Sequence, residues 1–191
     1  MKTLKTIALV FSTVAIFTSC SDDDNKSTPV NEEELITTVK VTLTNGTNII
    51  TLTSKDLDGP DAPGATEITV DGPLLANTTY TGKVELLNET ETPVEIVSEE
   101  IEESAQEKLD HQFFFGALEG LLGTFTYDDE DGEGNPIGLS FTFTTGAAST
   151  GSLSVTLRHL PNKSATGVSS GDITNAGGTT DATAIFPIIV Q

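Results

Sequence analysis

From residue 35 onward, apolar and polar side chains alternate along the chain with a period of two. In ITTVKVTLT (residues 36–44) the valines and the leucine fall on one face of an extended strand, while Lys40 falls on the other. The runs NIITLTSKD (48–56) and TTYTGKVELL (78–87) follow the same pattern. Because successive side chains of a strand point to opposite faces, this pattern predicts strands that are buried on one side only. Threonine, valine and isoleucine dominate these runs, as a half-buried pleated surface favours.

Turn-forming sequences separate the runs along the whole chain. TNGT, VDGP, GEGNP, TGAASTG and NAGG all combine glycine with residues that favour turns. The C-terminal half adds five more strand candidates: HQFFFGAL, TFTYDD, IGLSFTFTT, GSLSVTLRH and ATAIFPIIV. Short strands at this spacing predict an all-β fold, and we expect a two-sheet, immunoglobulin-like β-sandwich of about eight to ten strands. We interpret the first four C-terminal candidates as an up-and-down meander.

One segment does not follow the strand period. VSEEIEESAQEKLD (residues 97–110) is rich in good helix formers, with Ser98 as a candidate N-cap and two glutamates in the first turn after it. It predicts a short helix near residues 98–109 that links two strands. The alternative is that its first half continues the strand PVEIV.

The N-terminal segment MKTLKTIALVFSTVAIFTSC has the layout of a secretory signal. Lys2 and Lys5 precede an apolar run over residues 7–17, and small residues up to Ser19 precede Cys20. The apolar run has about 11 residues, fewer than the roughly 20 that a membrane-spanning helix needs. The segment therefore predicts targeting rather than a membrane span.

The only cysteine of the chain follows this signal directly. Its position resembles the lipobox of bacterial lipoproteins, although Phe17 stands where that pattern prefers an aliphatic residue. The resemblance implies cleavage between Ser19 and Cys20 and acylation of Cys20 with fatty acids such as palmitate. Several acyl chains on one residue would anchor the protein stably. The alternative is an ordinary secretory signal with an incidental cysteine.

The residues behind the cysteine point to the cell surface. Ser21, Asp22, Asp23 and Asp24 resemble the lipoprotein export signal of Bacteroidota, which sends proteins to the outer face of the outer membrane. The segments ITTVKVTLT, NTTYTGKVELLNETETP, DHQFFF, GNPIGL and LRHLPNKSATGVSSGDITNAGGTTD resemble a small family of flavobacterial surface lipoproteins without an established activity. Some members carry the label of a type 1 periplasmic binding fold, which fits poorly because that fold is a large α/β structure. The resemblance implies a partner at the surface, such as a receptor protein.

These observations divide the chain into three parts. Residues 1–19 are a lipoprotein signal peptide, residues 20–34 are a lipidated acidic tether, and residues 35–191 are a single β-sandwich domain. The tether assignment rests on the polar, charged sequence SDDDNKSTPVNEEE.

Composition restricts the function further. With 29 acidic and 9 basic residues, the formal net charge is −20, so the chain would repel phosphate backbones and we expect no nucleic-acid partner. There is no tryptophan for stacking sugars or bases, and one cysteine cannot form an internal disulfide. Neither H-E-x-x-H nor a phosphate loop occurs, so we expect no enzyme activity.

In the predicted strands, each of the two histidines lies on the same face as the apolar side chains. In a simple meander, the strand that starts at His111 and the strand that ends at His159 would bring these residues to one end, together with Asp110 and the acidic turn. Two histidines can ligate a transition metal or clamp a haem. The alternative is that both are packed or surface residues.

Two acidic loops are candidate calcium sites. In DDEDGEGNPIG, Asp129, Asp131 and Glu133 stand at alternate positions before a glycine, as in a calcium loop, and Asp128 precedes them. The match fails at the twelfth position, where Ser140 replaces the expected glutamate. The second loop, KDLDGPDAPG, offers Asp56, Asp58 and Asp61. Calcium is the cofactor these loops suggest, and the alternative is that both are solvated turns.

The sequence thus predicts a non-catalytic binding module, lipid-anchored at the outer membrane and exposed at the cell surface. It would capture a ligand or partner, as an accessory to an uptake receptor in one version of this hypothesis. The alternatives are metal or haem capture through His111 and His159, and a calcium-stabilised adhesion or spacer domain.

Overall fold

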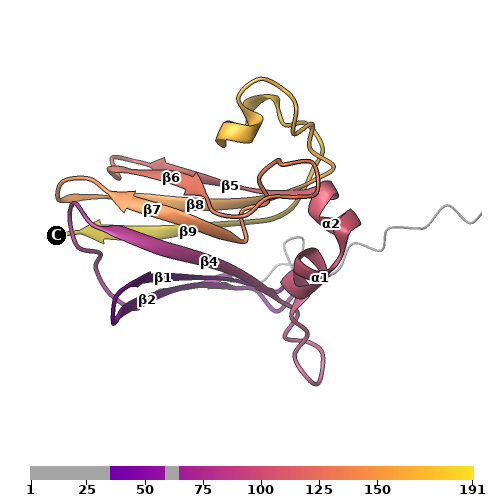
Figure 1. The fold of residues 1–191 in the computed structure, drawn as a ribbon. Coiled ribbons are helices and arrows are strands. Elements are labelled where there is room, and N and C mark those ends of the chain that lie inside the picture. Colours follow the sequence, from indigo (N-terminus) through magenta and orange to yellow (C-terminus); the bar gives the residue numbers. More distant parts are fainter. Residues whose placement is uncertain (1–34, 59–64) are drawn as a thin grey trace, which may run out of the picture. The chain divides into compact units, whose positions relative to one another are not determined.

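The computed structural model describes residues 35–58 and 65–191, which form two antiparallel β-sheets (Figure 1). The expected all-β, two-sheet sandwich is confirmed, with nine strands in the described ranges. The strands are β1 (Thr38–Asn45), β2 (Asn48–Lys55), β3 (Glu67–Val70), β4 (Thr79–Leu87), β5 (His111–Leu118), β6 (Gly123–Tyr127), β7 (Ser140–Thr145), β8 (Ser149–His159) and β9 (Thr179–Val190). The predicted signal peptide and tether, with Ser19, Cys20 and residues 21–24, lie outside the described residues, as does Asp61.

The sheets differ in size and separate strands that are neighbours in sequence. The six-stranded sheet has the order β3-β2-β1-β4-β7-β6, and the three-stranded sheet has the order β5-β8-β9. The predicted meander of β5, β6, β7 and β8 is therefore wrong, because β6 and β7 belong to one sheet and β5 and β8 to the other. The chain crosses between sheets after β5 and again after β7, so that each strand can bury its apolar face in the shared interior.

The core lies between the sheets and is built by the alternating positions. Val41, Leu43 and Leu52 from the larger sheet are fully buried, as are Leu153 and Phe186 from the smaller one. Phenylalanine rings connect the layers, because Phe115 of β5 stacks on Phe141 of β7 with ring centroids 4.0 Å apart. The period of two thus sets which face of each strand enters the core.

Two short helices occupy the segment that departs from the strand period. They are α1 (Val97–Glu103) and α2 (Ala105–Asp110), so the predicted helix is confirmed and the alternative of a continued strand is wrong. Ser104 separates the helices and caps α2 by accepting a hydrogen bond from the Glu107 amide. Ser98 does not cap α1, because its buried hydroxyl accepts from the Leu86 amide of β4 instead. None of the helices in the described part of the chain is long and apolar enough to span a membrane.

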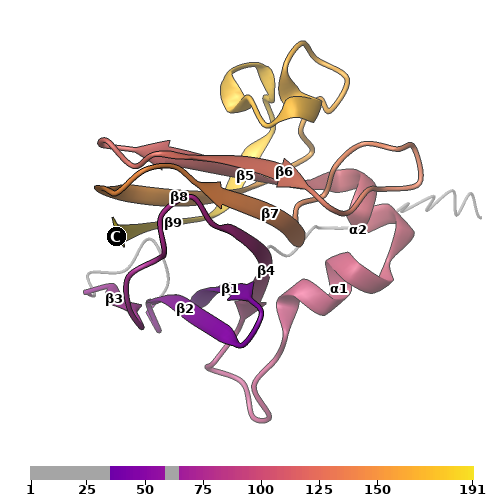
Figure 2. The same ribbon diagram turned by 60° about the vertical axis from the view of Figure 1, so that its left-hand side comes forward.

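A long connection between β8 and β9 covers part of the outer face of the smaller sheet. It contains two 3-10 helices, η1 (Val168–Ser170) and η2 (Ile173–Asn175). Phe114 points out of the sandwich, where Val168 and Ala176 of this connection bury it in a small second core. Figures 1 and 2 show this connection standing over the sandwich, while α1 and α2 lie at one end of the strands.

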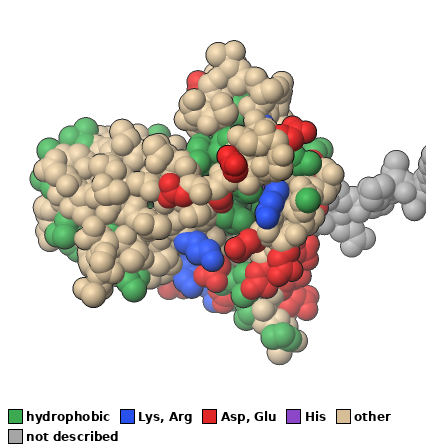
Figure 3. Space-filling model, viewed as in Figure 1, with side chains coloured by type: hydrophobic (Ala, Val, Ile, Leu, Met, Phe, Trp, Pro, Cys, Tyr) green, Lys and Arg blue, Asp and Glu red, His purple; other side chains and the backbone are tan. Residues whose placement is uncertain are grey.

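Charge is distributed unevenly between the two ends of the strands. Residues 89–110, which include both helices, contain nine acidic residues and one lysine. At the opposite end, the connections 45–48, 71–78, 118–123 and 145–149 contain only Asp71 and Glu119. Figure 3 shows the acidic side chains gathered at the helix end and almost none at the other. We call these two regions the helix end and the neutral end.

Candidate metal site

The two histidines of the chain lie side by side at the helix end of the smaller sheet. His111 at the start of β5 is the direct cross-strand partner of His159 at the end of β8. The next pair outward, Asp110 and Leu160, is hydrogen-bonded, so the histidines occupy the close, non-hydrogen-bonded type of pair. Their rings stack with centroids 4.8 Å apart and an interplanar angle of 11°. The meander was wrong, yet the two histidines do lie at one end of the strands, as it predicted, and they are also direct neighbours.

Asp181 joins the histidines from the third strand of the same sheet. The register of β8 and β9 shifts between Leu157 and Arg158, and this β-bulge leaves Asp181 without a cross-strand partner. Its Oδ2 lies 3.3 Å from Nε2 of His111. Its Oδ1 is buried and accepts no hydrogen bond. Because a buried carboxylate oxygen without a donor is costly, this oxygen is available to a proton donor or a cation.

The ring of His111 is held at its other nitrogen by α2. Nδ1 lies 3.0 Å from the backbone carbonyl oxygen of Glu107 and 3.3 Å from the Glu107 carboxylate. A carbonyl oxygen can only accept, so this contact makes Nδ1 the donor and turns Nε2 toward Asp181. Burial by itself lowers the pKa of His111, but the hydrogen bonds with Asp181 and with the Glu107 carbonyl outweigh it, and the pKa is raised.

Together, His111, His159 and Asp181 form a compact set of metal-ligating groups, which we call the HHD site. One nitrogen from each ring and one carboxylate oxygen all lie within 4.8 Å of one another. The donors around a tetrahedral zinc ion, with bonds of about 2.0–2.1 Å, are roughly 3.4 Å apart. To hold one ion, the three donor atoms would therefore have to draw closer and the two stacked rings to turn toward it. The side chains of His111 and Asp181 are 12% and 13% exposed, so the site is largely sheltered but not sealed from solvent.

The acidic turn after β6 does not join this site. Asp131 is buried and forms an ion pair with Lys163, whose Nζ lies 2.9 Å from Oδ2. Its Oδ1 accepts hydrogen bonds from the amides of Glu133 and Asn135. Burial raises the pKa of Asp131, but these amides and Lys163 lower it more strongly, and the net shift is downward. The ammonium group of Lys163 thus stands where a loop-bound cation would interact with Asp131.

The other predicted calcium ligands of this turn also serve the fold. Asp129 accepts hydrogen bonds from the amides of Gly138 and Ser140, and Asp128 accepts one from the Thr142 hydroxyl. Glu133 contributes its backbone amide to Asp131. These contacts are local hydrogen bonds that stabilise the turn between β6 and β7.

The second acidic loop shows similar local contacts. Asp56 accepts hydrogen bonds from the Asp58 amide and the Thr66 hydroxyl. These bonds are those of a carboxylate that stabilises its own turn.

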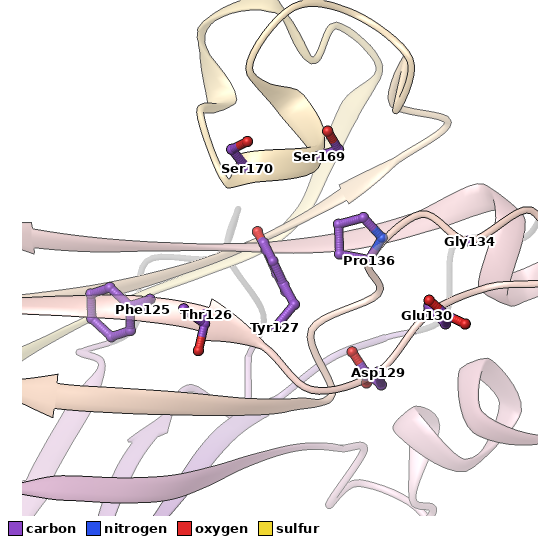
Figure 4. Close-up of a pocket in the computed structure, with 9 residues that line it drawn as sticks. All are labelled: Phe125, Thr126, Tyr127, Asp129, Glu130, Gly134, Pro136, Ser169 and Ser170. Carbon is purple, nitrogen blue, oxygen red and sulfur yellow. The ribbon is translucent and has the colours of Figure 1, made fainter.

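A shallow hollow of about 390 Å³ lies beside the acidic turn, at the free edge of β6 (Figure 4). It is lined by Phe125, Thr126, Tyr127, Asp129, Glu130, Gly134, Pro136, Ser169 and Ser170. The hydroxyl of Tyr127 donates to the Phe113 carbonyl oxygen, and burial raises its pKa to about 12. No residue of the HHD site lines this hollow, so the hollow and the HHD site are separate features of the molecule.

Sequence reasoning found two of the three HHD residues and missed Asp181. The meander placed both histidines at one end of their strands, although it did not predict that β5 pairs with β8. Asp181 comes just before the predicted strand ATAIFPIIV, and the bulge that places it cannot be read from alternation. Lys163, the partner of Asp131, was also missed, because 32 residues of sequence separate the two.

The protein-family models, the curated proteins and the solved structures were searched, and none of them matches this chain.

Proposed function

We propose that the mature protein is a lipid-anchored surface protein that captures a divalent transition-metal ion at the HHD site, without catalysing a reaction. The observation that carries this proposal is the convergence of His111, His159 and Asp181, with three donor atoms within 4.8 Å of one another. The buried, unpaired Oδ1 of Asp181 supports it, because a cation would satisfy that oxygen.

The donor set favours zinc, copper or nickel over calcium. Imidazole nitrogens suit these ions, whereas calcium takes six to eight oxygen ligands. Two histidines and one carboxylate form a common set of protein ligands for zinc. The orienting bond from Nδ1 of His111 to the Glu107 carbonyl oxygen is typical of a metal-ligating histidine.

The alternatives of haem capture and a calcium-stabilised spacer receive less support. A haem clamp needs two imidazoles whose nitrogens face each other across the iron. In the HHD site the two rings instead stack face to face with centroids 4.8 Å apart. For calcium, the carboxylates of Asp129 and Asp131 already accept hydrogen bonds from amides.

The anchor and the location rest on the sequence alone. Cys20 behind a secretory signal supports lipidation, and the run SDDD supports export to the surface of the outer membrane. At that surface the captured ion would pass to a receptor or another surface protein, which is the partner we propose. The proposal includes no nucleic-acid partner.

The test is thermal unfolding of the mature chain with Cys20→Ser, which removes the thiol as a competing ligand. Zinc at about 100 times its dissociation constant would stabilise the native state by roughly 2.7 kcal/mol and raise Tm by about 5 to 10 °C. His159→Ala and Asp181→Asn should each weaken zinc binding by ~100-fold or more in isothermal titration, because each removes a ligand.

Glu99→Gln is the matched control, since it removes an exposed carboxylate of α1 that is not part of the HHD site. It should leave zinc affinity unchanged. A wild-type Tm that responds equally to calcium and zinc, or zinc binding that survives both ligand substitutions, would contradict the proposal.

A further inference from the structure

We infer that an ion at the HHD site keeps at least one coordination position for a ligand from outside the protein, a small nitrogen or anionic oxygen donor. This inference rests on the proposed function, since it concerns the ion that the site would hold. It makes the site a place of ligand exchange, in contrast to a structural metal centre.

The three donors of the HHD site come from adjacent strands of one sheet and number one fewer than a tetrahedral ion takes. His111, His159 and Asp181 belong to the three adjacent strands of one sheet, β5, β8 and β9. The rings stack with an interplanar angle of 11°, so both must rotate before their in-plane lone pairs point at one ion. Three protein donors then fill three of the four positions of a tetrahedral ion, which leaves one position for another ligand.

Among the described residues, no fourth histidine, cysteine, aspartate or glutamate joins the three donors. The cluster of histidine and carboxylate donors in residues 35–58 and 65–191 contains the three HHD residues alone. The Glu107 carboxylate lies 3.3 Å from Nδ1 of His111, on the ring edge opposite to the Nε2 that faces Asp181. Asp131 is paired with Lys163. Structural zinc sites are closed by four protein ligands, whereas exchangeable sites use three and leave one position open.

The HHD site is not sealed from solvent. The side chains of His111 and Asp181 are each a little over one-tenth exposed. The nine acidic residues of the helix end would attract free cations toward the site and would disfavour large anions. A compact donor such as imidazole or acetate fits both conditions.

The experiment is visible absorption spectroscopy of the mature Cys20→Ser chain loaded with Co²⁺, a spectroscopic substitute for zinc. We expect the d–d bands to shift on addition of imidazole, and in a parallel titration with acetate, and to saturate at one external ligand per ion. Equilibrium dialysis must show that the protein retains its Co²⁺ throughout. This result supports a ternary complex at an open position.

Three outcomes would overturn the inference. A spectrum that does not change while Co²⁺ stays bound shows a closed site and leaves the proposed function standing. Loss of Co²⁺ to imidazole without a mixed species has the same meaning. A response in Glu107→Gln protein but not in wild type would assign the fourth position to Glu107. Failure of wild type to bind Co²⁺ at all, by contrast, removes the proposed function as well.

Discussion

At the scale of single residues, the buried ion pair of Asp131 and Lys163 holds the acidic turn in place. The carboxylate receives two amide hydrogen bonds and the ammonium group, and Lys163 also donates to the Lys108 carbonyl oxygen just before β5. The pair therefore connects three segments: the acidic turn, the connection after β8 and α2. Removing one partner leaves the other buried and unpaired, which is the costly case for a buried ion pair.

We expect Asp131→Asn to lower the free energy of unfolding by about 3 kcal/mol at neutral pH, measured by urea denaturation. The pKa of Asp131 in the folded protein lies below its ordinary value of 3.8. Its ionised form therefore contributes stability above that value, and this contribution is lost as the pH falls through the folded pKa. The difference between wild type and variant should accordingly shrink in strong acid.

Asp128→Asn is the control for this prediction. Asp128 is exposed and accepts one hydroxyl hydrogen bond, so its substitution should change stability by no more than about 0.5 kcal/mol. Equal effects of the two substitutions at neutral pH would show that the ion pair has no special role.

At the scale of elements, the contact between β4 and β7 depends on a missing side chain. Gly82 lies opposite Phe141 across the two strands. A Cβ added at Gly82 would come within 2.3–2.5 Å of three atoms of the Phe141 ring. Phe141 is fully buried and stacks on Phe115 of the other sheet, so the ring has no free direction in which to move. The glycine thus makes room for the ring that joins the two layers.

Gly82→Ala should destabilise the domain by about 1 to 3 kcal/mol, because it overpacks a filled core. The loss would be measured by chemical denaturation, with near-ultraviolet circular dichroism to follow the aromatic cluster. Gly132→Ala is the control, since a Cβ there meets no atom within 4 Å. If Gly82→Ala leaves the stability unchanged, the Phe141 ring can shift to make room for the added methyl group.

The elements themselves were largely predictable, whereas their pairing was only partly so. Alternation located the strands because one buried face imposes a period of two, and the glutamate-rich segment departed from that period. The division of β5, β6, β7 and β8 between two sheets was not predictable, because a meander and a sandwich bury the same alternate side chains of each strand. The histidines were nevertheless expected at one end, because β5 starts and β8 finishes at the same end of the strands in both arrangements. Asp181 was missed because a bulge, which alternation does not reveal, carries it to the site.

At the scale of the whole molecule, a net charge of −20 should make stability depend on salt. Carboxylates crowded at the helix end repel one another, and dissolved ions screen this repulsion. We expect Tm of the mature chain to rise by a few degrees when sodium chloride increases from about 10 to about 500 mM. Sodium salts of different anions at equal ionic strength separate screening from anion-specific effects. A Tm that falls with salt would mean that ion pairs such as Lys40–Glu85 outweigh the repulsion.

The separation of the helix end from the neutral end gives the domain an electric dipole moment along its strands. Near a positively charged surface, such a molecule does not tumble freely. It turns its helix end, with the HHD site, toward the positive charge and its neutral end away from it. Two copies that meet in solution repel most strongly when their helix ends approach each other. Long-range forces therefore align the domain before any short-range contact is made.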